Sequence, residues 1–231
     1  MNDNGFPQGA VLVFGGSGGI GQGVALEFAR GGVPVAVGNL RKADVAERVA
    51  REIRDEGVAA TTHCVDVTDL AQVDAALAAA SDAHGRVHTV VWAAGPFVNQ
   101  RHIVDMTHDD WRRAIEVETI GFLVAAKVAL PHFRASGGGS FVTLGPVGHL
   151  RWPDRDGLSV AHDCASASLA PGARSHFCNA FFNAFRVTRL TVTASCMRWR
   201  PSSLVQHVLR FRCAIRQIAC PGLARRIRIR S

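Results

Sequence analysis

The sequence predicts an α/β fold in which a doubly wound parallel sheet lies between two layers of helices. Three observations lead to this prediction. Short apolar runs alternate with segments of helical periodicity as far as about residue 163. A glycine-rich turn follows the first apolar run, and 231 residues with 48% apolar composition are enough for one domain with its own core. Strands that alternate with helices form a parallel sheet covered on both faces.

Four strands are predicted in the amino-terminal half, at residues 11–14, 33–37, 58–65 and 89–92. Each is a short run rich in β-branched or apolar residues, and helical segments follow the first three. The first helix covers Val24–Arg30, the second covers Ala43–Glu56, and Gly57 is expected to end the second. The third helix is expected to be capped by Thr68 and to end at Gly85.

The next predicted helix is long and apolar. Thr107 and Asp110 have the spacing of a capping box, and the apolar residues behind them continue to about Phe133. Three glycines, 137–139, then lead into a fifth strand, Ser140–Leu144. In such a sheet a ligand binds at the carboxyl ends of the strands.

The glycine-rich turn stands between the first strand and the first helix, with the spacing Gly-x-x-x-Gly-x-Gly. Glycines allow a tight turn and a close approach to a pyrophosphate, whose charge the start of the helix attracts. The turn lacks the Lys-Ser/Thr of a nucleotide-triphosphate loop. We therefore predict a dinucleotide cradle, against the alternative of a glycine-rich surface turn. The predicted contacts are Gly15, Ser17, Gly18, Gly19, Ile20 and Gly21.

Composition and short motifs argue against several other classes. No apolar run approaches the length of a membrane span, and the first residues have no basic-then-apolar pattern, so we expect a cytoplasmic protein without membrane partners. None of the six cysteines forms a Cys-x-x-Cys pair. The ten histidines include no i, i+4 pair backed by a carboxylate, and no metal site is predicted.

Two more motifs follow at regular intervals. Asp66-Val67 comes after the third strand, and Trp92-Ala93-Ala94-Gly95 ends the fourth. Together with Phe14–Gly21, they resemble the Asp-Val, Asn-Asn-Ala-Gly and Thr-Gly-x-x-x-Gly-Ile-Gly motifs of the short-chain dehydrogenase/reductase family. The resemblance covers residues 10 to about 160 and implies a Rossmann-type domain, which we place at residues 8–163.

The resemblance also implies a ligand and a reaction. Members of the family bind NAD(H) or NADP(H) and act on a carbonyl or alcohol group of a small molecule. By this resemblance Asp66 and Val67 would meet the adenine, and Ala93, Ala94 and Gly95 would line the middle of the cofactor. The alternatives are a turn or capping carboxylate for Asp66 and a plain strand-end turn for Ala94-Gly95.

The end of the second strand favours NADP(H) over NAD(H). An acidic residue there would bind the ribose 2′-hydroxyl of NAD, but the chain has Gly38-Asn39-Leu40-Arg41-Lys42. The Arg41 guanidinium could hold a 2′-phosphate with two hydrogen bonds. The alternative is that Arg41 and Lys42 are a solvated basic pair.

The catalytic motif of the family is where the chain departs from it. The resemblance implies a Ser, a Tyr and a Lys, yet the chain has no tyrosine. The Tyr position falls near Ser159, the Lys position falls on Asp163, and Glu118 stands where the family has a helix Asn in its proton relay. The resemblance as a whole predicts an NADP(H)-dependent oxidoreductase. The missing Tyr and Lys favour the alternative, a catalytically impaired or inactive NADP(H)-binding protein of the same fold.

The last part of the chain, residues 164–231, differs in composition. It contains twelve Arg, five Cys and no Lys, Asp or Glu. No strand is predicted in it, so the sheet is expected to be incomplete at the carboxyl end, with Ser140–Leu144 at an exposed edge. We interpret the segment as poorly ordered or non-native-like, from a frameshifted or truncated family member. It has no nucleic-acid motif. Homo-oligomerisation is left open.

Overall fold

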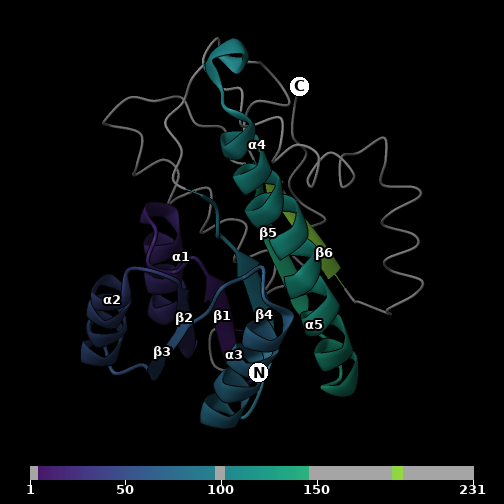
Figure 1. Ribbon diagram of the computed structural model, residues 1–231. Helices are drawn as coiled ribbons and strands as arrows, with labels where there is room; N and C mark the ends of the chain where they lie inside the picture. Colours follow the sequence, from purple (N-terminus) through teal and green to yellow (C-terminus); the bar gives the residue numbers. More distant parts are fainter. Residues whose placement is uncertain (1–4, 97–101, 146–188, 195–231) are drawn as a thin grey trace, which may run out of the picture.

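The computed structural model describes residues 5–96, 102–145 and 189–194, in which six strands form one parallel sheet (Figure 1). Neighbouring strands follow the order β3-β2-β1-β4-β5-β6, so the chain reverses its direction of growth between β1 and β4. Ligands of open parallel sheets bind beyond the carboxyl ends of the strands at such a switch point. The strands are β1 (Ala10–Phe14), β2 (Val35–Asn39), β3 (Ala60–Cys64), β4 (Val87–Trp92), β5 (Ser140–Gly145) and β6 (Arg189–Ala194).

Helices cover both faces of the sheet. On one face α1 (Gly19–Arg30) and α2 (Ala43–Asp55) bury residues such as Phe28 and Ile53 against the strands. On the other face α3 (Leu70–His84) and α5 (Phe122–Ala135) bury Leu77 and Phe133. The remaining helical segments are η1 (Ile103–Asp105), α4 (His108–Ala114) and η2 (Ile115–Gly121). The predicted three-layer α/β/α architecture is confirmed.

β6 corrects one expectation. Ser140–Leu144 does not lie at an exposed edge, because β6 pairs in parallel along the whole of β5, from Ser140 opposite Arg189 to Gly145 opposite Ala194. β6 comes from the segment in which no strand was predicted. Its sequence, Arg-Leu-Thr-Val-Thr-Ala, includes three successive β-branched residues, which favour strands. All other residues of 164–231 lie outside the described part of the chain.

The cap of α3 is also corrected. Asp69, not Thr68, caps this helix, because Asp69 Oδ1 accepts the backbone N–H groups of Ala71 and Gln72 at 2.9 and 3.2 Å. Thr68 donates its own N–H and hydroxyl to Asp66 Oδ1 instead. Both residues have side chains that can cap a helix, so composition alone does not choose between them.

The other helix signals agree with the structure. Gly57 and Gly85 follow α2 and α3 with φ of 80° and 81°, a region that glycine enters without a Cβ clash. At the start of α4, Thr107 Oγ1 accepts the Asp110 N–H while the Asp110 carboxylate accepts the Thr107 N–H. The predicted capping box is therefore present.

The long apolar helix is continuous from α4 to α5, but its middle, η2, is a π-helix. In Figure 1 it descends from above the sheet and passes in front of β5. π-helical turns are rare and occur often at functional sites. η2 contains Glu118, one of the residues predicted from the sequence to take part in the chemistry.

Candidate functional site at the carboxyl ends of the strands

The turn between β1 and α1 is held mainly by backbone hydrogen bonds, with one side-chain bond from Gln22 Nε2 to the Ser17 carbonyl oxygen at 3.1 Å. The Gly16 N–H donates to the carbonyl oxygens of Val13 and Gly38 at 3.2 and 2.8 Å, and the Gly18 N–H donates to that of Gly15 at 2.9 Å. Gly18 is the cap residue of α1, with no side-chain hydrogen bond to the helix start and no acidic residue in the first turn. The positive end of the α1 dipole is therefore left without a side-chain anion of its own.

Two glycines of this turn are sterically required. Gly15 has φ of 79°, and a Cβ built on it would overlap the Ala93 carbonyl. A Cβ on Gly21 would overlap the Gly15 carbonyl oxygen, since the first turn of α1 packs directly on the loop. By contrast, a Cβ on Gly19 meets nothing within 4 Å. Backbone atoms therefore fill the space around Gly15 and Gly21, whereas the space beside Gly19 at the start of α1 is open.

The end of β4 lies beside this turn. The Ala93 N–H donates to the Phe14 carbonyl oxygen at 3.0 Å, which extends the pairing of β1 with β4 past the last strand residues. A Cβ built on Gly15 would overlap the backbone of Ala93 and Ala94, so Gly15 lies directly against both residues. The structure thus brings the glycine turn and the predicted Ala93-Ala94-Gly95 segment together at one edge of the sheet.

At the end of β2, the sequence-based prediction missed Asn39. Its side chain is 4% exposed, its Nδ2 donates to the His63 carbonyl oxygen at 3.2 Å, and its buried Oδ1 has no partner among the described residues. Its place as the last residue of the second strand, where NAD-binding sheets have a carboxylate, is the signal that could have identified it. Arg41 and Lys42 follow and are exposed.

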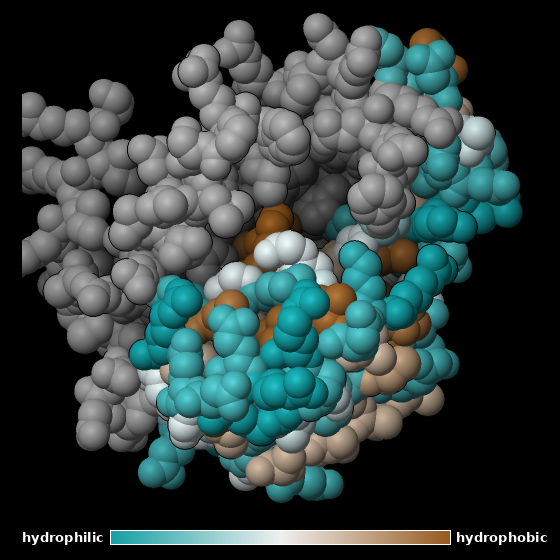
Figure 2. All heavy atoms as spheres, turned by 90° about the vertical axis from the view of Figure 1, so that its left-hand side faces the viewer, coloured by the Kyte–Doolittle hydropathy of each residue, from teal (hydrophilic) through white to brown (hydrophobic). Residues whose placement is uncertain are grey.

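Figure 2 views the molecule from the side on which α2 lies in Figure 1. Hydrophilic side chains cover most of the described surface there, with hydrophobic residues visible in the hollows between them. The exposed residues of α2 include Arg48 and Arg51 and also the acidic Asp44, Glu52 and Asp55. The surface that adjoins the end of β2 therefore carries exposed guanidinium groups and carboxylates together.

After β3, Asp66 has the turn role that was the alternative to adenine contact. Its Oδ1 accepts the Thr68 N–H and hydroxyl at 3.0 and 2.7 Å, and its own N–H donates to Gln72 Oε1 at 3.0 Å. Val67 is buried, and a Cβ on Gly121 would lie 3.1 Å from its Cγ2. The end of β3 is therefore packed against the π-helix.

Glu118 approaches the same edge from η2. A Cβ on Gly95 would lie 2.5 Å from Glu118 Oε1, so the half-buried carboxylate lies directly against the end of β4. The structure therefore places Glu118 beside the segment predicted to line the cofactor. Ser159, the other residue proposed for proton transfer, lies outside the described residues, as does Asp163.

Among the described residues, no group of three or more His, Cys, Asp or Glu side chains is arranged to hold a metal ion. Within the same residues, none of the helices is long and apolar enough to cross a membrane. The described edge of the sheet offers backbone N–H groups, small residues, the half-buried carboxylates of Asp66 and Glu118, and exposed arginines.

Comparison with known proteins gives consistent matches. The family model described as short chain dehydrogenase matches residues 9–151. The chain is 32% identical over 174 residues to cis-4-hydroxycyclohexanecarboxylate dehydrogenase of Sinomonas cyclohexanicum. The aligned residues make up 74% of this chain and 66% of that protein. It is 32% identical over 134 residues to 2,5-dichloro-2,5-cyclohexadiene-1,4-diol dehydrogenase of Sphingobium indicum, covering 58% and 53%. The matches thus span between about half and two thirds of these relatives.

A solved structure of a short-chain type dehydrogenase/reductase from Mycobacterium marinum has the same fold. It superposes with a TM-score of 0.69 and 26% sequence identity, over 80% of this chain and 73% of that one. The fold similarity therefore extends beyond the glycine turn to most of the sheet and its helices.

Proposed function

This chain belongs to the short-chain dehydrogenase family, and we propose that it is an NADP(H)-dependent oxidoreductase that acts on a carbonyl group or a secondary alcohol of a small molecule. Membership of the family implies a nicotinamide cofactor. The observation that carries the proposal is the glycine turn, whose two packed glycines and uncapped helix start form a space suited to a pyrophosphate.

The residues present fit such a cofactor. Gly15 and Gly21 close the loop so tightly that side chains are excluded, while Gly19 leaves the start of α1 open. We propose that Gly15, Ser17, Gly18, Gly19, Ile20 and Gly21 hold the pyrophosphate, and that Ala93, Ala94 and Gly95 line the middle of the cofactor. Val67 and Asp66 would border the adenine, with the Asp66 carboxylate already committed to its turn. The bound nicotinamide would accept or supply a hydride.

A preference for NADP(H) is supported by the end of β2. The strand ends in the uncharged Asn39, whose Nδ2 is held by the His63 carbonyl, so no carboxylate repels a 2′-phosphate. Arg41 is exposed two residues later and can reach solvent-side phosphate oxygens. We propose that Arg41 binds the 2′-phosphate of NADP(H).

The test of this step is a titration of the full chain with NADPH and with NADH. The change in nicotinamide fluorescence on binding gives the two affinities. Arg41→Asp should reverse the preference by about 1 to 3 kcal/mol, the value of a charged hydrogen bond. Arg51→Asp, at another exposed arginine near the end of β2, on α2, is the matched control and should leave the ratio of the two affinities unchanged. Equal affinity of the unmodified chain for both cofactors would refute the role of Arg41.

The relatives suggest a substrate class. Two of them are named for the oxidation of a hydroxyl group on a six-membered carbon ring. We propose cyclic secondary alcohols and the corresponding ketones as the first substrates to test, with open-chain carbonyl compounds as the comparison. Turnover confined to open-chain compounds would exclude the ring-alcohol class.

A second candidate function follows from one observation, the absence of tyrosine from the chain. General acid catalysis contributes about 10²- to 10⁴-fold to rate, so without a phenol the reaction should be slow or absent although cofactor still binds. In that case the chain is a catalytically impaired NADP(H)-binding protein. The same substrate panel decides, since NADPH oxidation at an ordinary turnover number would require another proton donor.

Glu118 and Ser159 are the residues to replace if turnover is found. Glu118 is the described candidate, because its carboxylate lies against Gly95. A loss of turnover in Glu118→Gln with unchanged NADPH affinity would support proton transfer through this carboxylate. A loss in Ser159→Ala alone would assign that step to Ser159.

A further inference from the structure

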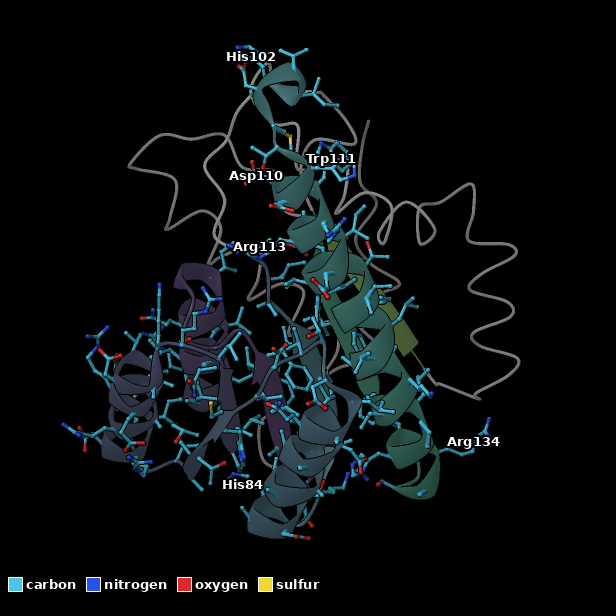
Figure 3. All side chains as sticks on the ribbon, viewed as in Figure 1. His84, His102, Asp110, Trp111, Arg113 and Arg134 are labelled. Carbon is cyan, nitrogen blue, oxygen red and sulfur yellow. The ribbon has the colours of Figure 1, made fainter. Side chains whose placement is uncertain are left out.

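Two imidazoles meet at one hydroxyl on the outermost strand of the sheet. Thr61 Oγ1 lies 2.9 Å from His63 Nε2 and 3.1 Å from His84 Nε2. Thr61 and His63 are on β3, two residues apart and therefore on the same face, and His84 is the last residue of α3. Figure 3 labels His84 at the lower end of α3. β3 lies two strands away from β1 and its glycine turn.

The convergence of both Nε2 atoms on one point is what distinguishes this pair from scattered surface histidines. Because they approach the same oxygen at hydrogen-bond distance, the two Nε2 atoms are directed into a common volume, and the hydroxyl can donate to one ring while it accepts the N–H of the other. The two rings come from a strand and a helix whose relative position is fixed by the packed core of that face, including Leu77 and Ala80 of α3. Such ligands are already oriented before an ion binds, which lowers the cost of binding.

The pair can also be reached from solvent. All three residues are only partly buried, so an ion and its water ligands can reach them.

We propose that His63 and His84, with the Thr61 hydroxyl between them, form a binding site for a divalent transition-metal ion of the Zn²⁺, Ni²⁺ and Cu²⁺ class. The two Nε2 atoms are the ligands that select this class, since imidazole binds these metals in preference to Mg²⁺ or Ca²⁺. The Thr61 oxygen and water complete the coordination. With two protein nitrogens the site is open and exchangeable, unlike a closed four-ligand structural zinc site.

The site is independent of the proposed oxidoreductase activity. It uses no residue of the glycine turn, of the end of β4 or of η2. A negative result in the cofactor titrations therefore leaves this proposal standing, and a negative result here leaves the cofactor proposal standing.

The experiment is calorimetric titration of the full chain with Zn²⁺ alone at pH 7.5, compared with three variants. His63→Gln and His84→Gln should each weaken the binding of one equivalent of Zn²⁺ about tenfold or more, because one of two ligands is removed. His102→Gln is the matched control, since His102 is exposed and lies beyond the other end of the sheet, before η1, and should leave the affinity unchanged (Figure 3). Affinity that is equal in all four proteins would overturn the proposal.

A second measurement needs no variant and so does not depend on whether the substitutions fold. Diethylpyrocarbonate modifies accessible imidazoles, and mass spectrometry reports the rate at each histidine of the unmodified chain. Zn²⁺ should slow the modification of His63 and His84 and leave that of His102 unchanged. Modification of His63 and His84 at the same rate with and without Zn²⁺ would assign any observed binding to other residues and refute the site.

Discussion

The two edges of the sheet use polar groups in opposite ways. At the carboxyl edge, the turn between β1 and α1 has backbone hydrogen bonds, glycines and an uncapped helix start. At the amino edge, Arg86 donates through Nη1 to the Ser136 carbonyl at 2.8 Å and through Nη2 to the Gly138 carbonyl at 3.0 Å. His132 Nε2 donates to the Val87 carbonyl at 2.9 Å. The amino edge is closed by side chains, whereas the start of α1 at the carboxyl edge is left open.

The difference shows how one sheet provides both stability and a site. Side chains that satisfy carbonyl groups at the amino edge hold the loop between α5 and β5 against β4. N–H groups at the start of α1 are available to an anion because no side chain caps this helix. Changes at the two edges should therefore separate ligand binding from folding.

The largest effect is expected from Gly21→Ala at the carboxyl edge. The added Cβ would overlap the Gly15 carbonyl oxygen, so the first turn of α1 must shift. We expect a loss of about 3 kcal/mol or more in unfolding free energy, at or beyond the upper end of overpacking effects, together with loss of NADPH binding. Urea denaturation and fluorescence titration measure the two quantities.

Gly23→Ala in the same helix is the matched control. Nothing lies within 4 Å of a Cβ at Gly23, and alanine is the better helix former. We expect this variant to be more stable by about 0.5 to 1 kcal/mol and to bind the cofactor normally. If Gly21→Ala behaves like Gly23→Ala, the close packing of the turn is not what forms the site.

The next effect is a pH dependence that originates at the amino edge. Burial, and then the nearby Arg86 charge, lower the pKa of His88 from 6.5 to about 4. The unfolded chain therefore takes up this proton more readily than the folded one. The contribution of a neutral His88 is complete above pH 6.5 and is lost as the pH falls to about 4. Over that interval the unfolding free energy should decrease by about 3 kcal/mol.

Denaturation midpoints between pH 4 and pH 8 test this expectation. His88→Leu removes the titrating group and also a buried Nε2 that has no partner among the described residues, so the decrease should become much smaller. The His63 and His84 pKa values are lowered too and add a decrease of the same sign. An unchanged pH profile in His88→Leu would assign the acid sensitivity to other groups.

Arg86→Lys should have a smaller effect at the same edge. A lysine ammonium cannot donate to the Ser136 and Gly138 carbonyls in the fixed fork that the guanidinium provides. We expect a loss of about 2 kcal/mol in unfolding free energy, with NADPH affinity unchanged. Arg112→Lys, an exposed position on α4, is the control and should change neither quantity. A loss of cofactor affinity in Arg86→Lys would show that the two edges are not independent.

The sequence was informative where structure depends on neighbours along the chain. Apolar periodicity, the place of the glycine turn between a strand and a helix, and the Thr107–Asp110 capping box are local signals, and the structure has all three where they were predicted. β6 was missed because its pairing with β5 joins residues far apart in sequence. The π-helical character of η2 was missed because its composition is that of an ordinary helix. The contact of Glu118 with Gly95 and the hydrogen bond of Asn39 to the His63 carbonyl depend on the assembled sheet.

The smallest effect is expected at the start of α3, which also lies at the carboxyl edge but is capped by a side chain. Asp69 caps α3 through Oδ1, and its Oδ2 also accepts from Gln72 Nε2 at 2.9 Å, whereas α1 has no such cap. Asp69→Ala should lower the unfolding free energy by about 1 kcal/mol, the usual value of a lost cap.

Asp69→Asn should restore most of that loss, since an amide oxygen also caps a helix, and Asp74→Ala, exposed within the same helix, should cost little. None of these three variants should alter NADPH affinity, because the proposed phosphate site is the start of α1 and α3 contributes no N–H group to it. A change in cofactor affinity in Asp69→Ala, without a matching change in Asp74→Ala, would show that α3 and α1 share the binding of the anion. The contrast between a capped and an uncapped helix would then fail as the explanation of where the ligand binds.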